Sequence, residues 1–150
     1  MDGLEYPVTD VAFPQMRLQI AASVARLADS EYQRRVWVGE EWPSAGFYDD
    51  AANSIEWLDE NTLAFDDPEG LVGQMLFPDE VLLMSLLAVR VRAILDDLGI
   101  VDSATYLSDP RWPAVLEVAG RLRAIMERNG GYPLPEHGLA PVRRSEPERP

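Results

Sequence analysis

The chain has 150 residues, of which 47% are hydrophobic and 26% charged, a composition typical of one globular domain with a packed core. It contains no cysteine, which excludes disulfides, thiolate nucleophiles and cysteine-ligated metal sites. The formal net charge of −13 argues against nucleic acid and anionic membranes as partners, because both are bound through positively charged surface.

The sequence carries no signal for export or membrane insertion. Residues 1–5 lack the basic start and the apolar run of a secretory signal. The longest apolar stretch, residues 81–89, is much shorter than the about 20 residues that a membrane-spanning helix needs. We therefore expect a cytoplasmic protein.

The first predicted helix begins near Pro14. Its apolar residues recur at three- and four-residue steps, which places them on one stripe of a helix that faces the core. The stripe consists of Phe13, Met16, Ile20, Val24 and Leu27. Arg17 and Arg26 lie off this stripe, so we expect them to face away from the core.

Residues 31–38 are ambiguous between two structures. They could continue as a second helix, or they could become extended at the Val-Trp-Val triplet of residues 36–38. Gly39 ends either structure. The following residues 40–46 are rich in turn formers and predict a loop, in which Trp42 is a candidate exposed aromatic side chain.

Two further helices are predicted between residues 48 and 76. The first is capped by Asp49 or Asp50 and closes at residues 61–62, with an apolar face formed by Ala51, Ala52, Ile55 and Leu58. The second starts at the Asp67-Pro68-Glu69 signal and runs as a short helix to about Leu76.

The strongest helical signal covers residues 78–98. Apolar residues leave almost no polar face in its first three turns, and a helix that is apolar all round must be surrounded by other elements. Gly99 supplies the stop. The last helix is predicted from the Ser108-Asp109-Pro110 start to the stop at residues 129–131, with a buried stripe from Trp112 to Met126.

These elements predict an all-α, single-domain bundle of five or six helices around a central apolar helix at about residues 79–98. A short extended segment near residues 35–38 remains an open alternative. The helical domain is expected to cover residues 1–130. Residues 131–150 are rich in proline and poor in apolar side chains, which predicts a flexible C-terminal tail.

The charges are distributed unevenly along the chain. Between Arg35 and Arg90 there is no basic residue, whereas the same segment contains twelve carboxylates. Like charges repel over roughly 8 Å at physiological salt, so gathering them opposes folding unless something compensates. Some of these acids are expected to cap helices or to keep the protein soluble. The others are expected to form a negative face that attracts and binds a basic protein.

The predicted binding surface combines acids with aromatic side chains that could serve as anchors. Trp57 is left out because it neighbours Ile55 and Leu58 and could belong to the core. The predicted partner-binding residues are Glu40, Glu41, Trp42, Tyr48, Asp49, Asp50, Glu56, Asp59, Glu60, Asp66 and Asp67.

Several motifs together carry a resemblance to other proteins: residues 31–40, Tyr48-Asp49, residues 63–68 and residues 109–112. Over roughly residues 13–128, the chain resembles a group of small acidic actinobacterial proteins of unassigned activity. In size and acidity it also resembles immunity proteins that neutralise basic nuclease or deaminase toxins. The second resemblance implies a basic toxin as the partner.

Enzymatic readings find little support in the sequence. The only histidine, His137, lies in the proline-rich tail, where a general base would not be held rigidly. We expect no cofactor. The alternative enzyme is an all-α nucleotide hydrolase that binds Mg²⁺ or Mn²⁺ through carboxylates, because Glu56, Asp59 and Glu60 share one helical face. A further alternative is a homodimeric scaffold built on surplus apolar helix surface.

Overall fold

The structure is a computed structural model that describes residues 11–131, and in this range it is an all-α single domain, as predicted. Six α-helices are joined by a π-helix and two short 3-10 helices, and no β-strand forms in this range. The α-helices are α2 (Pro14–Leu27), α3 (Ser30–Tyr32), α4 (Ala51–Asp59), α5 (Val81–Leu98), α6 (Ser103–Ser108) and α7 (Trp112–Asn129). The π-helix spans Gln33–Val38, and the 3-10 helices span Glu69–Leu71 and Pro78–Glu80. The predicted tail after residue 131 and His137 lie outside the described residues.

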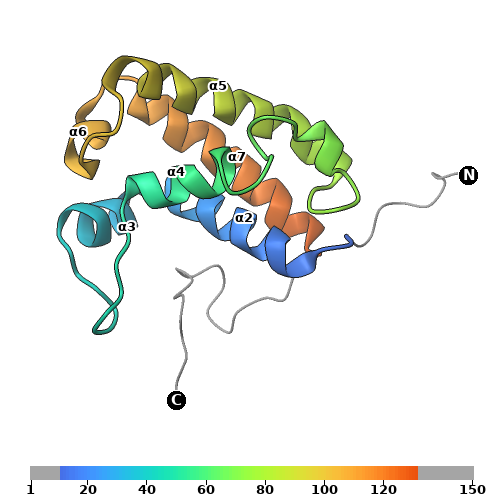
Figure 1. Ribbon diagram of the computed structural model, residues 1–150, viewed down its shortest axis with the longest axis horizontal. Coiled ribbons are helices and arrows are strands. Elements are labelled where there is room, and N and C mark those ends of the chain that lie inside the picture. The colour runs from blue at the N-terminus through green and yellow to red at the C-terminus, as the bar shows by residue number, and fades with distance from the viewer. Residues whose placement is uncertain (1–10, 132–150) are drawn as a thin grey trace, which may run out of the picture.

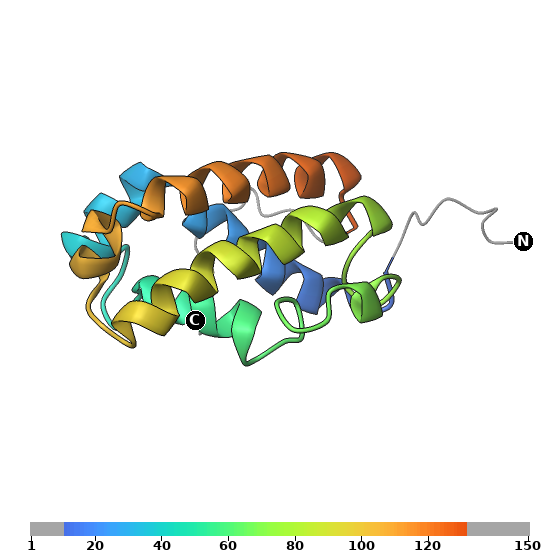
Figure 2. The ribbon, with the colours of Figure 1, turned by 90° about the horizontal axis from the view of Figure 1, so that it is seen from above.

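The bundle is built around α2 and α7. The helix α2 packs against both α7 and α4, and α5 packs along α7 (Figure 1). Seen from above, α5 and α7 run side by side with α2 beneath them (Figure 2). Every residue of α2 from Ile20 to Leu27 is buried. The interior of the domain is therefore organised around α2.

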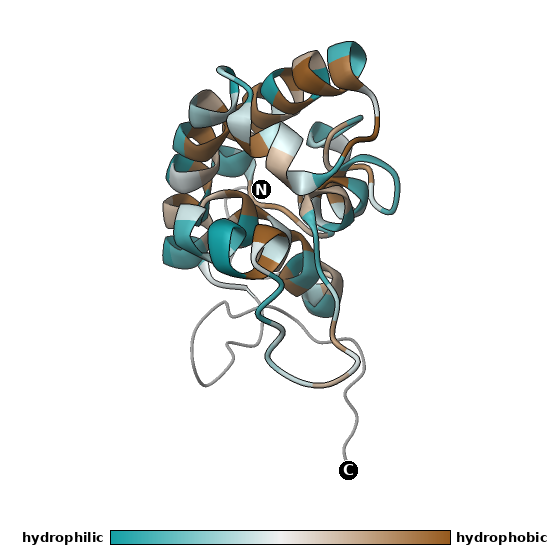
Figure 3. Cartoon of the chain, turned by 90° about the vertical axis from the view of Figure 1, so that its left-hand side faces the viewer, coloured by the Kyte–Doolittle hydropathy of each residue, from teal (hydrophilic) through white to brown (hydrophobic). Residues whose placement is uncertain are grey.

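The expectation that residues 79–98 form the central helix is not confirmed. Leu82 and Val89 of α5 are 79% and 62% exposed, and α5 lies along the upper edge of the molecule in Figures 1 and 3. Only its inner face, which includes Leu83, Leu87 and Val91, is buried. An all-apolar sequence shows that a helix has apolar surface on every side, but it does not show what covers each side.

Arg17 and Arg26 do not face away from the core, contrary to the prediction, and both side chains are buried. The guanidinium of Arg17 donates from Nη1 and Nη2 to Oε1 and Oε2 of Glu80, each over 2.7 Å. Arg17 Nε also donates to the carbonyl of Gly130, over 2.7 Å. Glu80 accepts further hydrogen bonds from the backbone N–H of Phe77 and the side chain of Asn129. This ion pair joins α2, the start of α5 and the end of α7.

The segment predicted as helical or extended at residues 35–38 is a π-helix. The backbone N–H of Gly39 donates to the carbonyl of Arg34, five residues back, over 2.9 Å. This wider turn buries the adjacent side chains of Val36 and Trp37 together, while Val38 is exposed. A β-strand would have pointed Val36 and Trp37 to opposite faces.

The helix predicted from Asp67 to about Leu76 is wrong beyond its first turn. The 3-10 helix ends at Leu71, and Gly73, in the left-handed conformation with φ 87°, reverses the chain so that Val72 and Leu76 form an isolated bridge.

The helix α6 was not predicted. Its start is capped by Asp102, whose carboxylate accepts a hydrogen bond from the backbone N–H of Thr105.

Helix ends were otherwise predicted within a few residues. Asp50, one of the two predicted caps, accepts from the backbone N–H of Asn53 at the start of α4, which ends at Asp59 rather than at residues 61–62. The last helix begins at Trp112, slightly after the predicted proline start, and ends before Gly130 as expected.

The Glu80→Gln variant tests the buried ion pair. It removes the carboxylate charge that the buried guanidinium of Arg17 binds through Nη1 and Nη2, so the free energy of unfolding should fall by about 3–5 kcal/mol in a denaturant titration. The matched control is Glu127→Gln, which removes an exposed acid paired with Arg123 on α7 and should cost well under 1 kcal/mol. Equal losses in the two variants would show that the buried pair has no special importance.

Candidate functional site

The twelve carboxylates of the cation-free segment fall into a buried group and a surface group. Asp49 and Glu80 are buried, with 1% and 0% of their surface exposed. The other ten are exposed or half-buried. Asp49 is therefore not part of the predicted negative surface, whereas the other predicted acids are at least partly exposed.

Asp49 belongs to the core and is a correction to the predicted site. Its Oδ2 accepts hydrogen bonds from the Tyr32 hydroxyl and from Trp37 Nε1, both over 2.7 Å, and its Oδ1 accepts from Asn53 Nδ2 over 2.8 Å. Arg26 Nε lies 3.9 Å from the same carboxylate. Burial, followed by the charge of Asp49 and its hydrogen bond, raises the pKa of Tyr32. Substituting Asp49 would change stability, so this residue cannot report on a surface interaction.

Part of the surface group lies in and beside the loop between the π-helix and α4. This loop extends away from the bundle in Figure 1. Trp42 is half-buried and lies against Phe47 and Tyr48, with ring centroids 6.2 and 5.4 Å apart. Tyr48 is 65% exposed, and its hydroxyl donates to Asp50 over 2.6 Å. That hydrogen bond is the main cause that raises the pKa of Tyr48 to about 12.

The acids of this loop are partly occupied by other contacts. Glu41 is paired with Arg35 at 3.5 Å, and Asp50 caps α4. Glu40 is exposed and adopts the left-handed conformation, with φ 58°. The loop thus presents Trp42 and Tyr48 beside charge that is already partly neutralised.

The remaining predicted acids lie on α4 and the residues that follow it. Arg92 of α5 binds the carboxylate of Asp59, and it binds Asp66 over 2.6 Å. Its guanidinium also lies 5.7 Å from the ring centroid of Phe65. The hydrogen bond with Asp59 is the main cause that raises the pKa of Arg92. Sequence analysis missed Arg92, because its position gives no indication that it reaches two acids from other elements.

The last turn of α4 carries negative side chains at the C-terminal end of the helix, which is itself negative. Glu56, Asp59 and Glu60 stand where the free carbonyls of the helix already create negative potential, and no basic residue lies in that turn. Arg92 neutralises only Asp59 among them. Glu56 and Glu60 make no ion pair within the described part of the chain, so a cation would be attracted to this turn.

A small pocket lies beside this turn. It has a volume of about 50 Å³, and its apolar lining comes from Ala52 and Ile55 of α4, Leu95 of α5, and Ile100. Tyr106 of α6 and the three carboxylates of the α4 turn complete the lining. The carboxylates were predicted from the sequence, whereas Leu95, Ile100 and Tyr106 were not.

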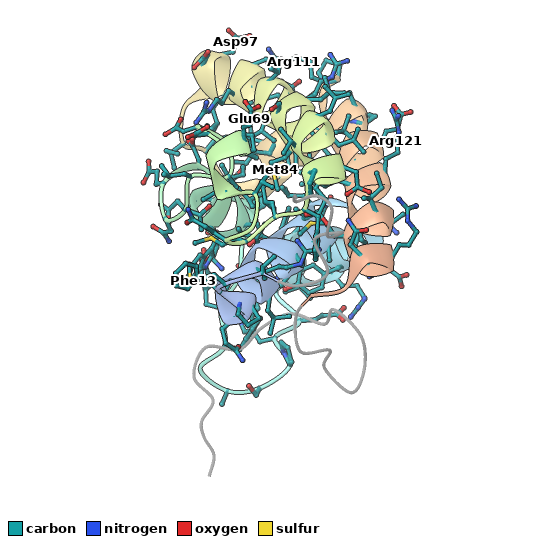
Figure 4. The ribbon with its side chains drawn as sticks, turned by 90° about the vertical axis from the view of Figure 1, so that its right-hand side faces the viewer. Phe13, Glu69, Met84, Asp97, Arg111 and Arg121 are labelled. Carbon is teal, nitrogen blue, oxygen red and sulfur yellow. The ribbon has the colours of Figure 1, made fainter. Side chains whose placement is uncertain are left out.

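Two oppositely charged side chains illustrate the two sides of the bundle. Figure 4 shows Glu69 on the side of α4 and its following loop, whereas Arg121 projects from α7 on the opposite side. Glu69 and Asp67 are exposed and make no ion pair among residues 11–131. Together with Glu56, Asp59, Glu60 and Asp66, they make up what we call the α4 acidic surface: Glu56, Asp59, Glu60, Asp66, Asp67 and Glu69.

Within residues 11–131, no group of three or more His, Asp or Glu side chains is arranged to hold a metal ion. In the same range, no helix combines the length and the apolar character needed to cross a bilayer. The Asp59 carboxylate, part of the predicted carboxylate metal site, is instead bound to Arg92.

The fold is an all-α domain in which Glu56, Asp59 and Glu60 lie together at the end of α4. The chain belongs to the family described as a domain of unknown function, DUF7945, whose model matches residues 11–131. Comparison with curated proteins and with solved structures gives no match. This family agrees with the predicted resemblance to proteins of unassigned activity; the actinobacterial origin and the likeness to immunity proteins stay predictions.

The Glu60→Gln variant tests whether the α4 turn is electrostatically unfavourable. Removing a negative charge from the negative end of a helix should raise the free energy of unfolding by roughly 0.3–1 kcal/mol at low salt. The control Glu117→Gln removes an exposed acid from within α7 and should leave stability nearly unchanged. Thermal unfolding at low and high salt measures both, and a loss of stability in Glu60→Gln would contradict the argument.

Proposed function

We propose that this chain is a non-enzymatic binding module whose α4 acidic surface binds a basic protein. A basic toxin that the chain neutralises, as immunity proteins do, would be one such partner. The aromatic side chains Trp42 and Tyr48 are the proposed apolar anchors at the edge of the contact, with Glu40, Glu41 and Asp50 around them.

The observation that carries this proposal is the incomplete neutralisation of the cation-free segment. Arg35 and Arg92 contact only some of its surface acids. Glu56, Glu60, Asp67 and Glu69 make no ion pair within the described residues. Surface carboxylates gathered without counter-charges lower stability, so the presence of these unpaired acids supports a role outside folding.

The electrostatics also indicate how the partner would associate. A surface of one sign speeds the encounter with an oppositely charged protein, and this gain falls as salt screens the field. Surface acids that lie beside an apolar pocket can hold the partner after the encounter, because contacts at the edge of a desolvated patch are screened less. We therefore expect both the association rate and the affinity to depend on salt.

A nona-arginine peptide serves as the probe of this surface. Isothermal titration should show binding that weakens strongly as salt rises, and the Glu56→Gln/Glu60→Gln double variant should weaken binding at low salt several-fold. The control double variant Glu117→Gln/Glu127→Gln removes the same number of negative charges, but from α7, and should have a much smaller effect on binding. Salt-independent binding, or equal effects of the two double variants, would refute the proposed surface.

The homodimeric scaffold has one observation in its favour. Leu82 and Val89 lie seven residues apart on one face of α5 and are largely exposed, although such apolar side chains gain from burial. A dimer that used this face would leave the α4 acidic surface free, so the two functions are compatible. Light scattering at two protein concentrations would distinguish a dimer, whose mass rises with concentration, from a monomer of constant mass.

A further inference from the structure

We propose that the pocket beside the α4 turn receives an arginine side chain of the basic partner. This inference rests on the proposed function and specifies which chemical group the α4 acidic surface recognises. Its starting point is the pocket itself, which has both an apolar and a charged part. Ala52, Ile55, Leu95 and Ile100 supply the apolar part, and Glu56 and Glu60 supply carboxylates that form no ion pair with any residue from 11 to 131.

The size of the pocket fits the methylene stem of a long side chain. A volume of about 50 Å³ is too small for a nucleotide or a drug-sized ligand, whose pockets measure roughly 300–1,000 Å³. A buried water occupies roughly 10–15 Å³ by the same kind of measure, so the pocket has room for a few groups of that size. Arginine and lysine both bury an aliphatic stem against apolar surface while the charged head stays in contact with water.

The electrostatics of the pocket select a cation. Glu56 and Glu60 stand one helical turn apart at the negative end of α4, where a positive charge is favoured by the carboxylates and by the helix end together. Tyr106 also lines the pocket, and its hydroxyl donates to the carbonyl of Gly99 over 2.7 Å.

The chain itself already shows how this surface binds a guanidinium. Asp59, which also lines the pocket, accepts hydrogen bonds from Arg92 Nε and Nη2, and Asp66 accepts another from Nη2. The same guanidinium lies near the ring of Phe65. The guanidinium of Arg92 thus has an apolar contact on one side and two carboxylates as hydrogen-bond acceptors. A second guanidinium, from the partner, would find the same combination at Ile55, Glu56 and Glu60.

Arginine fits this arrangement better than lysine. Its planar fork has several N–H donors that can bridge two carboxylates, whereas the ammonium of lysine is compact and more strongly hydrated. A weakly hydrated cation is also less costly to place against apolar walls. The pocket should therefore prefer arginine to lysine several-fold.

The first experiment uses N-acetyl-arginine amide and N-acetyl-lysine amide as probes of the full chain. Methyl NMR spectra should show saturable shifts for Ile55, Leu95 and Ile100 with the arginine probe, and several-fold weaker binding of the lysine probe. Equal binding of both probes, or shifts confined to methyl groups outside the pocket, would overturn the inference.

The second experiment fills the pocket without changing any charge. The Ala52→Leu variant should weaken binding of the arginine probe and of nona-arginine several-fold, whereas the control Ala124→Leu, at an exposed position of α7, should not. Should Ala52→Leu fail to fold, Glu56→Gln gives the second test, because it removes a lining carboxylate and should weaken the arginine probe more than the lysine probe.

Two outcomes distinguish an error in the pocket inference from an error in the proposed function. If nona-arginine binds and remains sensitive to Glu56→Gln/Glu60→Gln while Ala52→Leu has no effect, the pocket is wrong and the proposed function stands. If nona-arginine does not bind, the proposed function fails.

Discussion

Folding of this domain depends on how a segment of twelve carboxylates and no cation is neutralised. The segment cannot form ion pairs within itself, so its counter-charges come from helices outside it. Arg17 of α2 holds Glu80, sixty-three residues away in the sequence, and Arg92 of α5 holds Asp59 and Asp66. Because these partners lie far apart in the chain, the ion pairs also fix how α2, α4, α5 and α7 are placed against one another.

The same constraint explains the surface. Arginines that lie outside the cation-free segment contact only the acids nearest to them. In a buried pair such as Arg17 with Glu80, the two charges neutralise each other inside the fold. Among residues 11–131, Arg92 is the one arginine that forms an ion pair with the acids at the end of α4. These acids therefore keep a surplus of negative charge beside a helix end that is itself negative. A protein selected for stability alone would place cations there. This conflict between local stability and retained charge is the physical basis of the proposed binding role.

The sequence allowed the fold class and most helix positions to be predicted, because apolar periodicity, proline starts and glycine stops are local signals. The buried roles of Arg17, Arg26 and Asp49 could not be predicted, since an ionised side chain is buried only when a distant partner compensates it, and the pattern around each residue does not name that partner. The central position assigned to α5 failed for a related reason: composition shows that Leu82 and Val89 are apolar, but not that their face is left uncovered. Of the site, all the acids except Glu69 were among the predicted residues, whereas Arg92, Leu95, Ile100 and Tyr106 joined it only through tertiary packing.

The central claim is that the negative charge left over after folding forms one binding surface at the end of α4. Amide chemical-shift mapping of the labelled full chain with nona-arginine tests it most directly. The account predicts that the largest shifts fall in residues 55–60, 66–69 and 95–100. Shifts of similar size on α7, or shifts scattered over all faces of the domain, would show that the peptide responds only to net charge and would contradict the account.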